Sequence, residues 1–294
     1  VETIVGDICD EAVLTRLLAQ YEITEIYHLA ALLSTRAEFT PETAHQVNVN
    51  GTLNLLKLAA EQARTQGRHV KFVFPSSIAV YGIADLDAKY AAGRVGEDEH
   101  CRPHTMYGCN KLYCEALGRY YAQFYRWLDQ DRPSEILDFR CLRFPGLISA
   151  HTVPAGGTSD FGPEMIHAAA AGERYACFVR PDTCIPFMTM PDAIDALLQL
   201  ASADGAGLTR QVYNVQAFNP SAGEFHDLVQ RWFPEAPGVT FEPDTARQAI
   251  VDSWPEAVDD AAARADWGYQ PRHDLDAAFA EYLVPAMQAR YGTD

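Results

Sequence analysis

The sequence lacks the features that mark several large classes of protein. No apolar run approaches the roughly 20 residues that a membrane-spanning helix needs. Lys and Arg number 23 against 40 Asp and Glu, which gives a net charge of −17, and no stretch gathers the basic residues into a stripe. A chain so acidic is not expected to bind nucleic acid or an anionic membrane. Its first residues, Val-Glu-Thr-Ile-Val-Gly-Asp, also lack the basic start and apolar core of a signal peptide.

The cysteines lack a pattern as well. There are seven of them, scattered along the chain, and none belongs to a Cys-x-x-Cys pair. This arrangement indicates neither a zinc site nor a disulfide framework, and no other group of His, Cys, Asp and Glu has the spacing of metal ligands. We therefore expect reduced thiols in a cytoplasmic protein that binds no metal.

What the chain does have is the composition of a globular protein. It has 294 residues, of which 48% are apolar and 21% charged, enough for one large domain or two ordinary ones. Apolar stripes at helical spacing alternate with short apolar runs that are typical of buried strands. Strands are expected at residues 1–8, 26–31, 70–74, 136–144 and 212–216, and helices at about 11–21, 41–49, 51–66, 107–127, 163–171 and 190–203, with a polar loop at 83–104.

The alternation of strands and helices predicts an α/β fold, a doubly wound parallel sheet with helices on both faces. Residues 1–150 are expected to form a dinucleotide-binding domain, which residues 189–216 rejoin. Residues 151–188 and 217–294 are expected to form a smaller C-terminal substrate-binding lobe. In such sheets ligands bind at the carboxyl ends of the strands, where the sequence places Asp7, Ala30-Ala31, Ser76-Ser77 and Pro145-Gly146.

One part of that domain is missing from the sequence. A sheet of this kind normally opens with a strand, a glycine-rich turn and a helix whose N-terminus holds the dinucleotide pyrophosphate. Only six residues precede Asp7, and neither Gly156-Gly157 nor Gly205-x-Gly207 stands between a strand and a helix. Because the missing unit also supplies the central strand, its absence would leave backbone unpaired. We expect that an amino-terminal unit of about 30–50 residues is absent here, which the mass of the intact protein would test.

The strongest candidate for chemistry is the pair Tyr107 and Lys111. Four residues apart on a helix, their side chains lie on one face, one turn from each other. An ammonium near a phenol favours the phenolate and lowers the phenol pKa from its reference value of about 10. A phenol tuned in this way can take a proton from an alcohol at neutral pH. A solvated helix face is the alternative interpretation of the pair taken alone.

Other polar residues near the strand ends allow two interpretations each. Ser77 can hydrogen-bond a substrate oxygen or cap a turn. Asp7 can bind the adenine of a nucleotide or cap the next helix. Asn48 falls in a helix, where asparagine is unfavourable, and can bond the backbone at a strand end. His28, on an apolar strand, fits a buried histidine better than a catalytic base.

Taken together, the motifs match a known family. In chain order they are Gly-Asp-Ile at 6–8, His-Leu-Ala-Ala at 28–31, Asn-x-x-Gly-Thr at 48–52, Pro-Ser-Ser-x-x-Val-Tyr-Gly at 75–82, Tyr-Gly-x-x-Lys at 107–111 and Leu-Arg-Phe-Pro-Gly at 142–146. Over nearly its whole length the chain resembles the extended short-chain dehydrogenase/reductases, a superfamily that includes the nucleotide-sugar epimerases and dehydratases. The resemblance implies a Rossmann-type sheet and NAD as the cofactor.

Several stretches resemble more narrowly the short-chain type of L-threonine 3-dehydrogenase. They are residues 31–34, 137–149, 154–161 and 247–255, followed by 259–260 and 265–268. The chain departs from the family in three places: the glycine turn is absent, the loop at 83–104 is long, and an extra acidic stretch, 127–135, precedes the strand at 136.

The narrower resemblance implies that L-threonine is oxidised by NAD⁺ at its β-hydroxyl to 2-amino-3-oxobutyrate. It implies Tyr107 as the base, Lys111 as its partner and a ligand of the nicotinamide ribose, and Ser77 as the residue that orients the hydroxyl. The implied cofactor contacts are Asp7, Ile8, Leu29, Ala30, Ala31, Asn48, Ser76, Tyr107, Lys111 and Pro145. The implied substrate contacts are Ser34, Ser77, Tyr107, Gly157, Thr158 and Trp254. Family members commonly pair through the helices at about 51–66 and 107–127, so a homodimer is expected.

Two alternatives remain open. A nucleotide-sugar epimerase or dehydratase would need cationic groups for a diphosphate, but residues 185–294 hold only six arginines, spread out, and no lysine. A degenerate family member with a binding or regulatory role would be consistent with the missing glycine turn. The presence of Ser77, Tyr107 and Lys111 argues against that second alternative.

Overall fold

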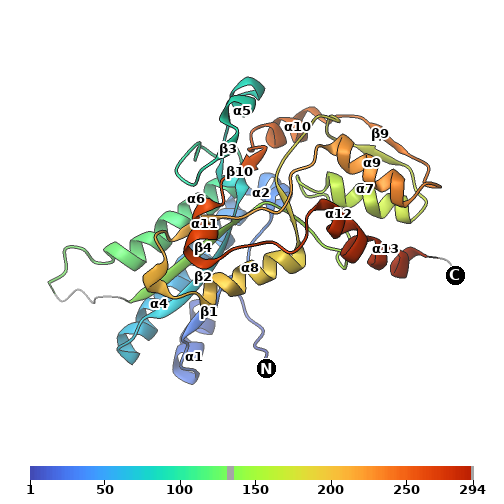
Figure 1. Cartoon of the computed structure of the whole chain (residues 1–294). Helices are drawn as coiled ribbons and strands as arrows, with labels where there is room; N and C mark the ends of the chain where they lie inside the picture. Colours follow the sequence, from blue (N-terminus) through green and yellow to red (C-terminus); the bar gives the residue numbers. More distant parts are fainter. Residues whose placement is uncertain (131–135, 293–294) are drawn as a thin grey trace.

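A four-stranded parallel sheet with the strand order β1-β2-β4-β8 lies at the centre of the computed structural model, which describes residues 1–130 and 136–292 (Figure 1). Its strands are β1 (Glu25–Tyr27), β2 (Val70–Ser77), β4 (Leu137–Phe144) and β8 (Val212–Asn214). The two long strands pair from Val70 opposite Leu137 to Ser77 opposite Phe144, so both end at the same edge of the sheet. The predicted α/β fold with a parallel Rossmann-type sheet is confirmed.

Helices cover both faces of this sheet. On one face lie α4 (Gly51–Gln66) and α6 (Met106–Arg119), and α1 (Glu11–Gln20) packs on the outer side of α4. The core of this layer contains Phe72, Phe74 and Phe139, whose rings lie 6.1–6.3 Å apart. On the opposite face α8 (Met190–Ser202) packs against β2 and β4. The sheet is therefore doubly wound, as the alternation of elements predicts.

The remaining elements are short. The helices are α2 (Ser34–Phe39), α3 (Pro41–His45), α5 (Leu86–Ala92), α7 (Phe161–Ala170), α9 (Ala222–Trp232), α10 (Thr245–Asp252), α11 (Ala261–Trp267), α12 (Leu275–Ala277) and α13 (Val284–Tyr291). Three π-helical turns, η1 (Gln46–Asn50), η3 (Tyr120–Phe124) and η5 (Ala278–Leu283), and two 3₁₀ turns, η2 (Ile78–Val80) and η4 (Gly205–Gly207), adjoin them. Parallel strand pairs join β3 (Arg94–Val95) to β10 (Ala257–Val258), β5 (Gly146–Ile148) to β7 (Phe187–Thr189), and β6 (Tyr175–Cys177) to β9 (Val239–Phe241).

A second group of elements lies beyond the carboxyl edge of the sheet. Figure 1 shows α7, α9, α12 and α13 clustered with β9, on the side where the chain ends. Their core is aromatic and fully buried, with Phe161, Phe187, Phe225 and Phe279 at its centre. The segment from α8 to β8 belongs to the main sheet. These positions are consistent with the proposed division into a dinucleotide-binding domain and a smaller lobe.

The structure differs from the expected elements in several places. Residues 1–8 form no strand, because a strand exists through its hydrogen bonds to a neighbour and, among the described residues, none pairs with this segment. The loop expected at 83–104 contains α5, which Asp85 caps, and β3. The helix α2 lies where the sequence predicted no element. Of the acidic stretch 127–135, residues 131–135 lie outside the described part of the chain.

Within residues 1–130 and 136–292, no helix has the length and apolarity to cross a bilayer.

Candidate active site

The helix α6 begins beside the carboxyl end of β2 for a local reason. Thr105 caps it by accepting a hydrogen bond from the Gly108 backbone N–H at 3.1 Å. A Cβ at position 108 would overlap the carbonyl oxygen of Ala79, so only glycine allows α6 to approach the turn after β2 this closely. The Glu38 carboxylate of α2 accepts a hydrogen bond from the Met106 N–H at 2.7 Å and fixes the same end from the other side.

This close approach brings Lys111 and Tyr107 together at the strand end. The buried Lys111 ammonium donates to the Pro75 carbonyl oxygen at 2.5 Å and lies 4.6 Å from the centre of the Phe74 ring. The same nitrogen is 5.6 Å from the centre of the Tyr107 ring. Among the described residues, nothing hydrogen-bonds the phenolic oxygen of Tyr107. The structure therefore places a fixed cation beside a phenol whose oxygen is available, which is the arrangement predicted from the four-residue spacing.

Ser77 and Ser76 end β2 and have different roles. The Ser77 hydroxyl accepts a hydrogen bond from the Ala79 N–H at 3.2 Å and so caps the turn η2, one of the two roles considered for it. Because that bond uses a lone pair of the oxygen, the hydroxyl proton can still be donated to a ligand. Ser76 is buried, and its hydroxyl lies 2.5 Å from the Glu115 carboxylate. A direct cofactor contact by Ser76 stays a prediction.

A buried ion pair behind Ser76 was not predicted from the sequence. Glu115 on α6 receives two hydrogen bonds from the Arg143 guanidinium of β4, at 2.9 and 2.6 Å, and both side chains are almost fully buried. Arg143 also donates to the Tyr81 hydroxyl at 3.0 Å, and burial raises the pKa of Tyr81 far above its ordinary value. The network joins α6, β2 and β4 at the level of the candidate site. Its members are far apart in sequence, so spacing offers no signal for it.

Asn48 holds the segment that follows β1. From the π-helical turn η1, its side chain accepts from the Leu32 N–H at 2.7 Å and donates to the Leu32 carbonyl at 3.0 Å. It also donates to Asn110 on α6 at 3.2 Å. The expectation that Asn48 bonds the backbone after a strand is confirmed, and these contacts make it a positioning residue. Its direct contact with a cofactor stays a prediction.

His28 is buried at the end of β1. Its Nε2 lies 2.8 Å from the Thr52 hydroxyl, while Nδ1 has no partner among the described residues. Burial, together with the nearby charge of Lys111, lowers the His28 pKa from 6.5 to about 4. A histidine that stays neutral and enclosed at physiological pH fits a structural role better than that of a base.

The carboxyl edge carries further residues that the resemblance assigns to NAD. Leu29 and Ala30 follow β1 directly and are exposed, Leu29 by 68%, while Ala31 is half-buried and Pro145, after β4, is buried. Such an apolar surface beside the Lys111 cation and the Tyr107 phenol fits the nicotinamide and ribose end of the cofactor. A glycine-rich turn that joins a strand to a helix, and would hold the pyrophosphate, is not found in residues 1–130 and 136–292.

Asp7 and Ile8 precede α1, where the adenine end was expected. The Asp7 carboxylate accepts a hydrogen bond from the Cys9 N–H at 2.8 Å, while the cap of α1 is Asp10, which accepts from the Ala12 N–H at 2.8 Å. The Ile8 side chain lies against Gly51 of α4. Asp7 is therefore not the cap of α1, and its contact with adenine stays a prediction.

Three of the residues expected to contact the substrate meet across the site. The Thr158 hydroxyl lies 3.5 Å from that of Ser34, although the two are 124 positions apart. Gly157 is held by the Asp160 carboxylate, which accepts from its N–H at 2.6 Å, and by Arg247, which donates to its carbonyl at 2.9 Å. Ser34 begins α2, the helix that also contacts the start of α6. The geometry thus joins the loop at 156–158 to the Tyr107 side of the site.

Trp254 has a different environment. It is 4% exposed and lies in the aromatic core of the lobe, against which the Tyr107 ring also packs. The hydrogen bonds that link Ser34, Gly157 and Thr158 do not include it. Two contributors that the sequence interpretation missed are Thr35, which donates to the Gly156 carbonyl at 2.9 Å, and Arg247.

Comparisons with known proteins find a matching family and similar chains. A model of the NAD dependent epimerase/dehydratase family matches residues 1–215. A mitochondrial L-threonine 3-dehydrogenase of Bos taurus is 36% identical over 293 residues, which are 99% of this chain and 71% of that protein. An uncharacterized epimerase/dehydratase of Staphylococcus saprophyticus is 34% identical over 285 residues, 97% of this chain and 82% of that protein.

Solved structures of similar proteins have the same fold. The L-threonine dehydrogenase of Clostridium difficile superposes with a TM-score of 0.86 at 30% identity, covering 99% of this chain and 84% of that one. A GalE-like L-threonine dehydrogenase of Cupriavidus necator in its holo form gives a TM-score of 0.79 at 32% identity, covering 95% and 84%.

Proposed function

The chain belongs to the NAD-dependent epimerase/dehydratase family, and we propose that it oxidises the β-hydroxyl of L-threonine to a ketone, with 2-amino-3-oxobutyrate as the product. NAD⁺, when bound, supplies the acceptor for the hydride that leaves the carbon bearing the hydroxyl. The observation that carries the proposal is the Lys111 ammonium, held by the Pro75 carbonyl beside the Tyr107 ring at the carboxyl end of β2.

Each residue of the pair has a defined task in this proposal. Tyr107 takes the proton of the β-hydroxyl on its phenolic oxygen, which makes no hydrogen bond with any described residue. Lys111 holds a positive charge beside the Tyr107 ring, and its position is fixed because a backbone carbonyl anchors it. Ser77 donates its free proton to the substrate oxygen and orients it. Lys111 and the apolar surface at 29–31 receive the nicotinamide ribose.

The substrate side supports a small amino acid better than a nucleotide sugar. Ser34, Gly157 and Thr158 offer hydroxyl and backbone groups, which suit the polar groups of a small zwitterion. A diphosphate would need free cations, but most of the arginines in 185–294 already have carboxylate partners. Arg210, Arg231, Arg264 and Arg272 pair with acidic residues, whereas Arg247 and Arg290 donate to backbone carbonyls.

A substrate comparison tests the proposal. NADH formation from NAD⁺ is followed with L-threonine, L-serine, 3-hydroxybutyrate and UDP-sugars side by side, each with the wild-type chain and with Tyr107→Phe. We expect oxidation of L-threonine in preference to 3-hydroxybutyrate, which lacks the amino group. Turnover of a UDP-sugar without net NADH formation would instead establish the epimerase alternative. NAD⁺ binding is measured in parallel by calorimetry, and bound NAD⁺ without turnover of any substrate would favour a regulatory role.

A further inference from the structure

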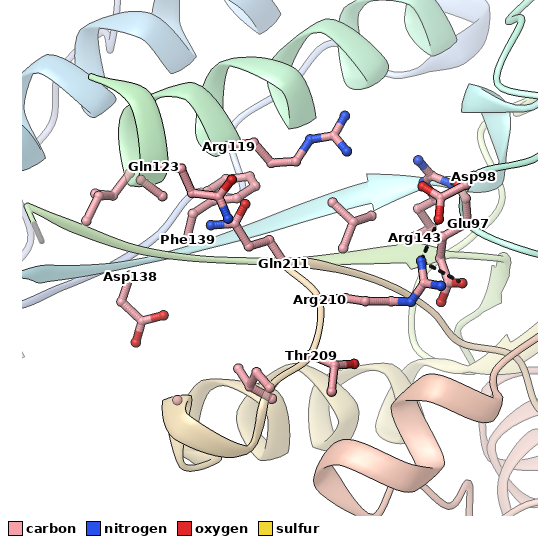
Figure 2. Close-up of a pocket in the computed structure, with 15 residues that line it drawn as sticks. Glu97, Asp98, Arg119, Gln123, Asp138, Phe139, Arg143, Thr209, Arg210 and Gln211 are labelled. Atoms are coloured by element: carbon pink, nitrogen blue, oxygen red, sulfur yellow. Dashed lines mark hydrogen bonds and ion pairs between the residues drawn. The ribbon is translucent and has the colours of Figure 1, made fainter. Parts of the chain in front are cut away.

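A cavity of about 430 Å³ lies beside β4 and β8, outside the candidate active site (Figure 2). Its walls are the end of α6, the start of β4 and the segment 205–212 that leads into β8. Polar residues of this wall, labelled in Figure 2, include Glu97, Asp98, Arg119, Asp138, Arg210 and Gln211. The volume is within the range of roughly 300–1,000 Å³ that small-molecule sites occupy.

The cavity is separated from Tyr107 along two elements. Arg119 follows Tyr107 by twelve residues on α6, which is about 18 Å at a rise of about 1.5 Å per residue. Asp138 lies at the opposite end of β4 from Phe144, about 20 Å away at about 3.3 Å per residue. A ligand in the cavity would therefore not compete directly for the Tyr107 site.

One positive charge in the cavity is uncompensated. Arg210 pairs with Asp98 at 2.8 Å and with Glu97 at 3.7 Å, Asp138 pairs with Arg140, and Arg143 pairs with Glu115. Arg119 is exposed and makes no hydrogen bond or ion pair with any described residue. The site thus offers a free guanidinium for a carboxylate, whereas each of the other cations already has a carboxylate partner.

The cavity wall also offers a ligand one unpaired polar atom and an apolar surface. The side-chain oxygen of Gln211 is buried and has no hydrogen-bond partner among the described residues, so it can accept from an N–H or O–H of a ligand. Phe139, Leu137, Leu208 and Val212 provide apolar wall beside it. A ligand that satisfies all three features carries a carboxylate, a hydrogen-bond donor and an apolar group.

We propose that this cavity binds an apolar α-amino acid, with its carboxylate at Arg119, its ammonium at the Gln211 oxygen and its side chain against Phe139 and Leu208. A zwitterion suits a site whose wall holds charges of both signs. The proposal does not depend on the oxidation of threonine, because it rests on residues that take no part in that chemistry.

L-leucine serves as the probe, and methyl NMR resonances of Leu137, Leu208 and Val212 report on the site. We expect these resonances to shift saturably with added leucine at millimolar concentration. Arg119→Gln should weaken the apparent affinity at least about tenfold, since it removes a charged hydrogen bond. Arg174→Gln is the matched control, because Arg174 is also exposed and has no partner among the described residues.

Two analogues and a second variant separate the three contacts. 4-Methylpentanoate lacks the ammonium and 3-methylbutylamine lacks the carboxylate, so both should bind at least about tenfold more weakly than leucine. Gln211→Leu should remove the preference of the site for leucine over 4-methylpentanoate. The proposal is overturned if the shifts do not saturate, if they appear only near Ser34 and Thr158, or if Arg119→Gln binds leucine as tightly as Arg174→Gln.

Discussion

Gly108 sets the distance between the helix of the candidate catalytic pair and the turn after β2. Gly108→Ala places a methyl group on the Ala79 carbonyl, so either α6 or the turn must shift. We expect a loss of roughly 1–3 kcal/mol in the free energy of unfolding, measured by urea denaturation, together with a loss of turnover. Gly207→Ala is the control, because a Cβ there meets nothing closer than 3.8 Å. Equal stability of the two variants would show that the close approach is not needed.

Tyr107 carries the proton transfer in the proposed reaction. Tyr107→Phe keeps the ring and its packing against the lobe core but removes the phenolic oxygen. We expect turnover of L-threonine to fall at least about a hundredfold, within the range for acid–base catalysis, with the unfolding midpoint nearly unchanged. The measurement is NADH formation in the steady state. A variant with near-normal turnover would remove Tyr107 from the mechanism.

His28 makes the stability depend on pH. Its pKa is about 4 in the folded chain because of burial and Lys111, against 6.5 in the unfolded chain. Between these values the unfolded chain holds a proton that the folded chain does not, so stability is lost as the pH falls from about 6.5 toward 4. His28→Gln should remove this contribution.

From about pH 7 to about pH 4.5, we expect the wild-type chain to lose roughly 2 kcal/mol more unfolding free energy than His28→Gln does, measured by urea titration. Carboxylates that titrate in the same range are common to both proteins and cancel in the comparison. Parallel losses in the two proteins would mean that His28 is protonated in the folded state.

The π-helical turn η1 positions the segment after β1 through the side chain of Asn48. Its two hydrogen bonds hold Leu32 and, with it, the segment between β1 and α2. Asn48→Ala should cost about 1–3 kcal/mol, because buried backbone groups lose their partners, and should raise KM by loosening Ser34. The control is Asn50→Ala on the same turn, whose amide bonds only to Gln46. Hydrogen exchange at Leu32 distinguishes the two variants.

The elements that the sequence predicted well are those with a strong local pattern. β2 and β4 are rich in apolar residues, and α4, α6 and α8 have apolar stripes, so their positions follow from the sequence pattern. α2 and α5 are short, and α2 is held by a tertiary contact of Glu38 with the start of α6. A segment such as 1–8 has the composition of a strand but, in the described structure, no neighbour with which to pair.

The same distinction applies to the candidate site. Tyr107 and Lys111 lie on one helix, so four-residue spacing predicts that they meet. Ser34 and Thr158 come together through the fold over 124 positions, and only the family resemblance pointed to them. Glu115 and Arg143 form a buried pair that neither spacing nor composition indicates.

At the scale of the whole molecule, α4 and α6 present the surface through which a homodimer is expected. Tyr113 on α6 is 53% exposed, and Tyr120 and Phe124 on the following turn are 43% and 44% exposed. Aromatic residues of this kind are enriched at interfaces. One similar L-threonine 3-dehydrogenase of known structure is described as monomeric, so a measured mass decides between the two states for this chain.

We expect light scattering after size exclusion to give the mass of a dimer. Tyr113→Glu should shift it toward the monomer, because a charge is placed in the buried part of the interface. Tyr90→Glu on α5, where Tyr90 is 52% exposed, is the control and should remain dimeric. A monomeric wild-type chain would contradict the prediction.

The helix α6 and its last turn carry Tyr107, Lys111, Glu115, Arg119 and Gln123 at intervals of four residues. Each added residue rotates everything beyond it by about 100° around the helix axis. An insertion between Lys111 and Arg119 would therefore leave the Tyr107 end in place and turn the Arg119 end away from β4. We therefore expect a residue inserted after position 123 to be tolerated better than one inserted between Lys111 and Arg119.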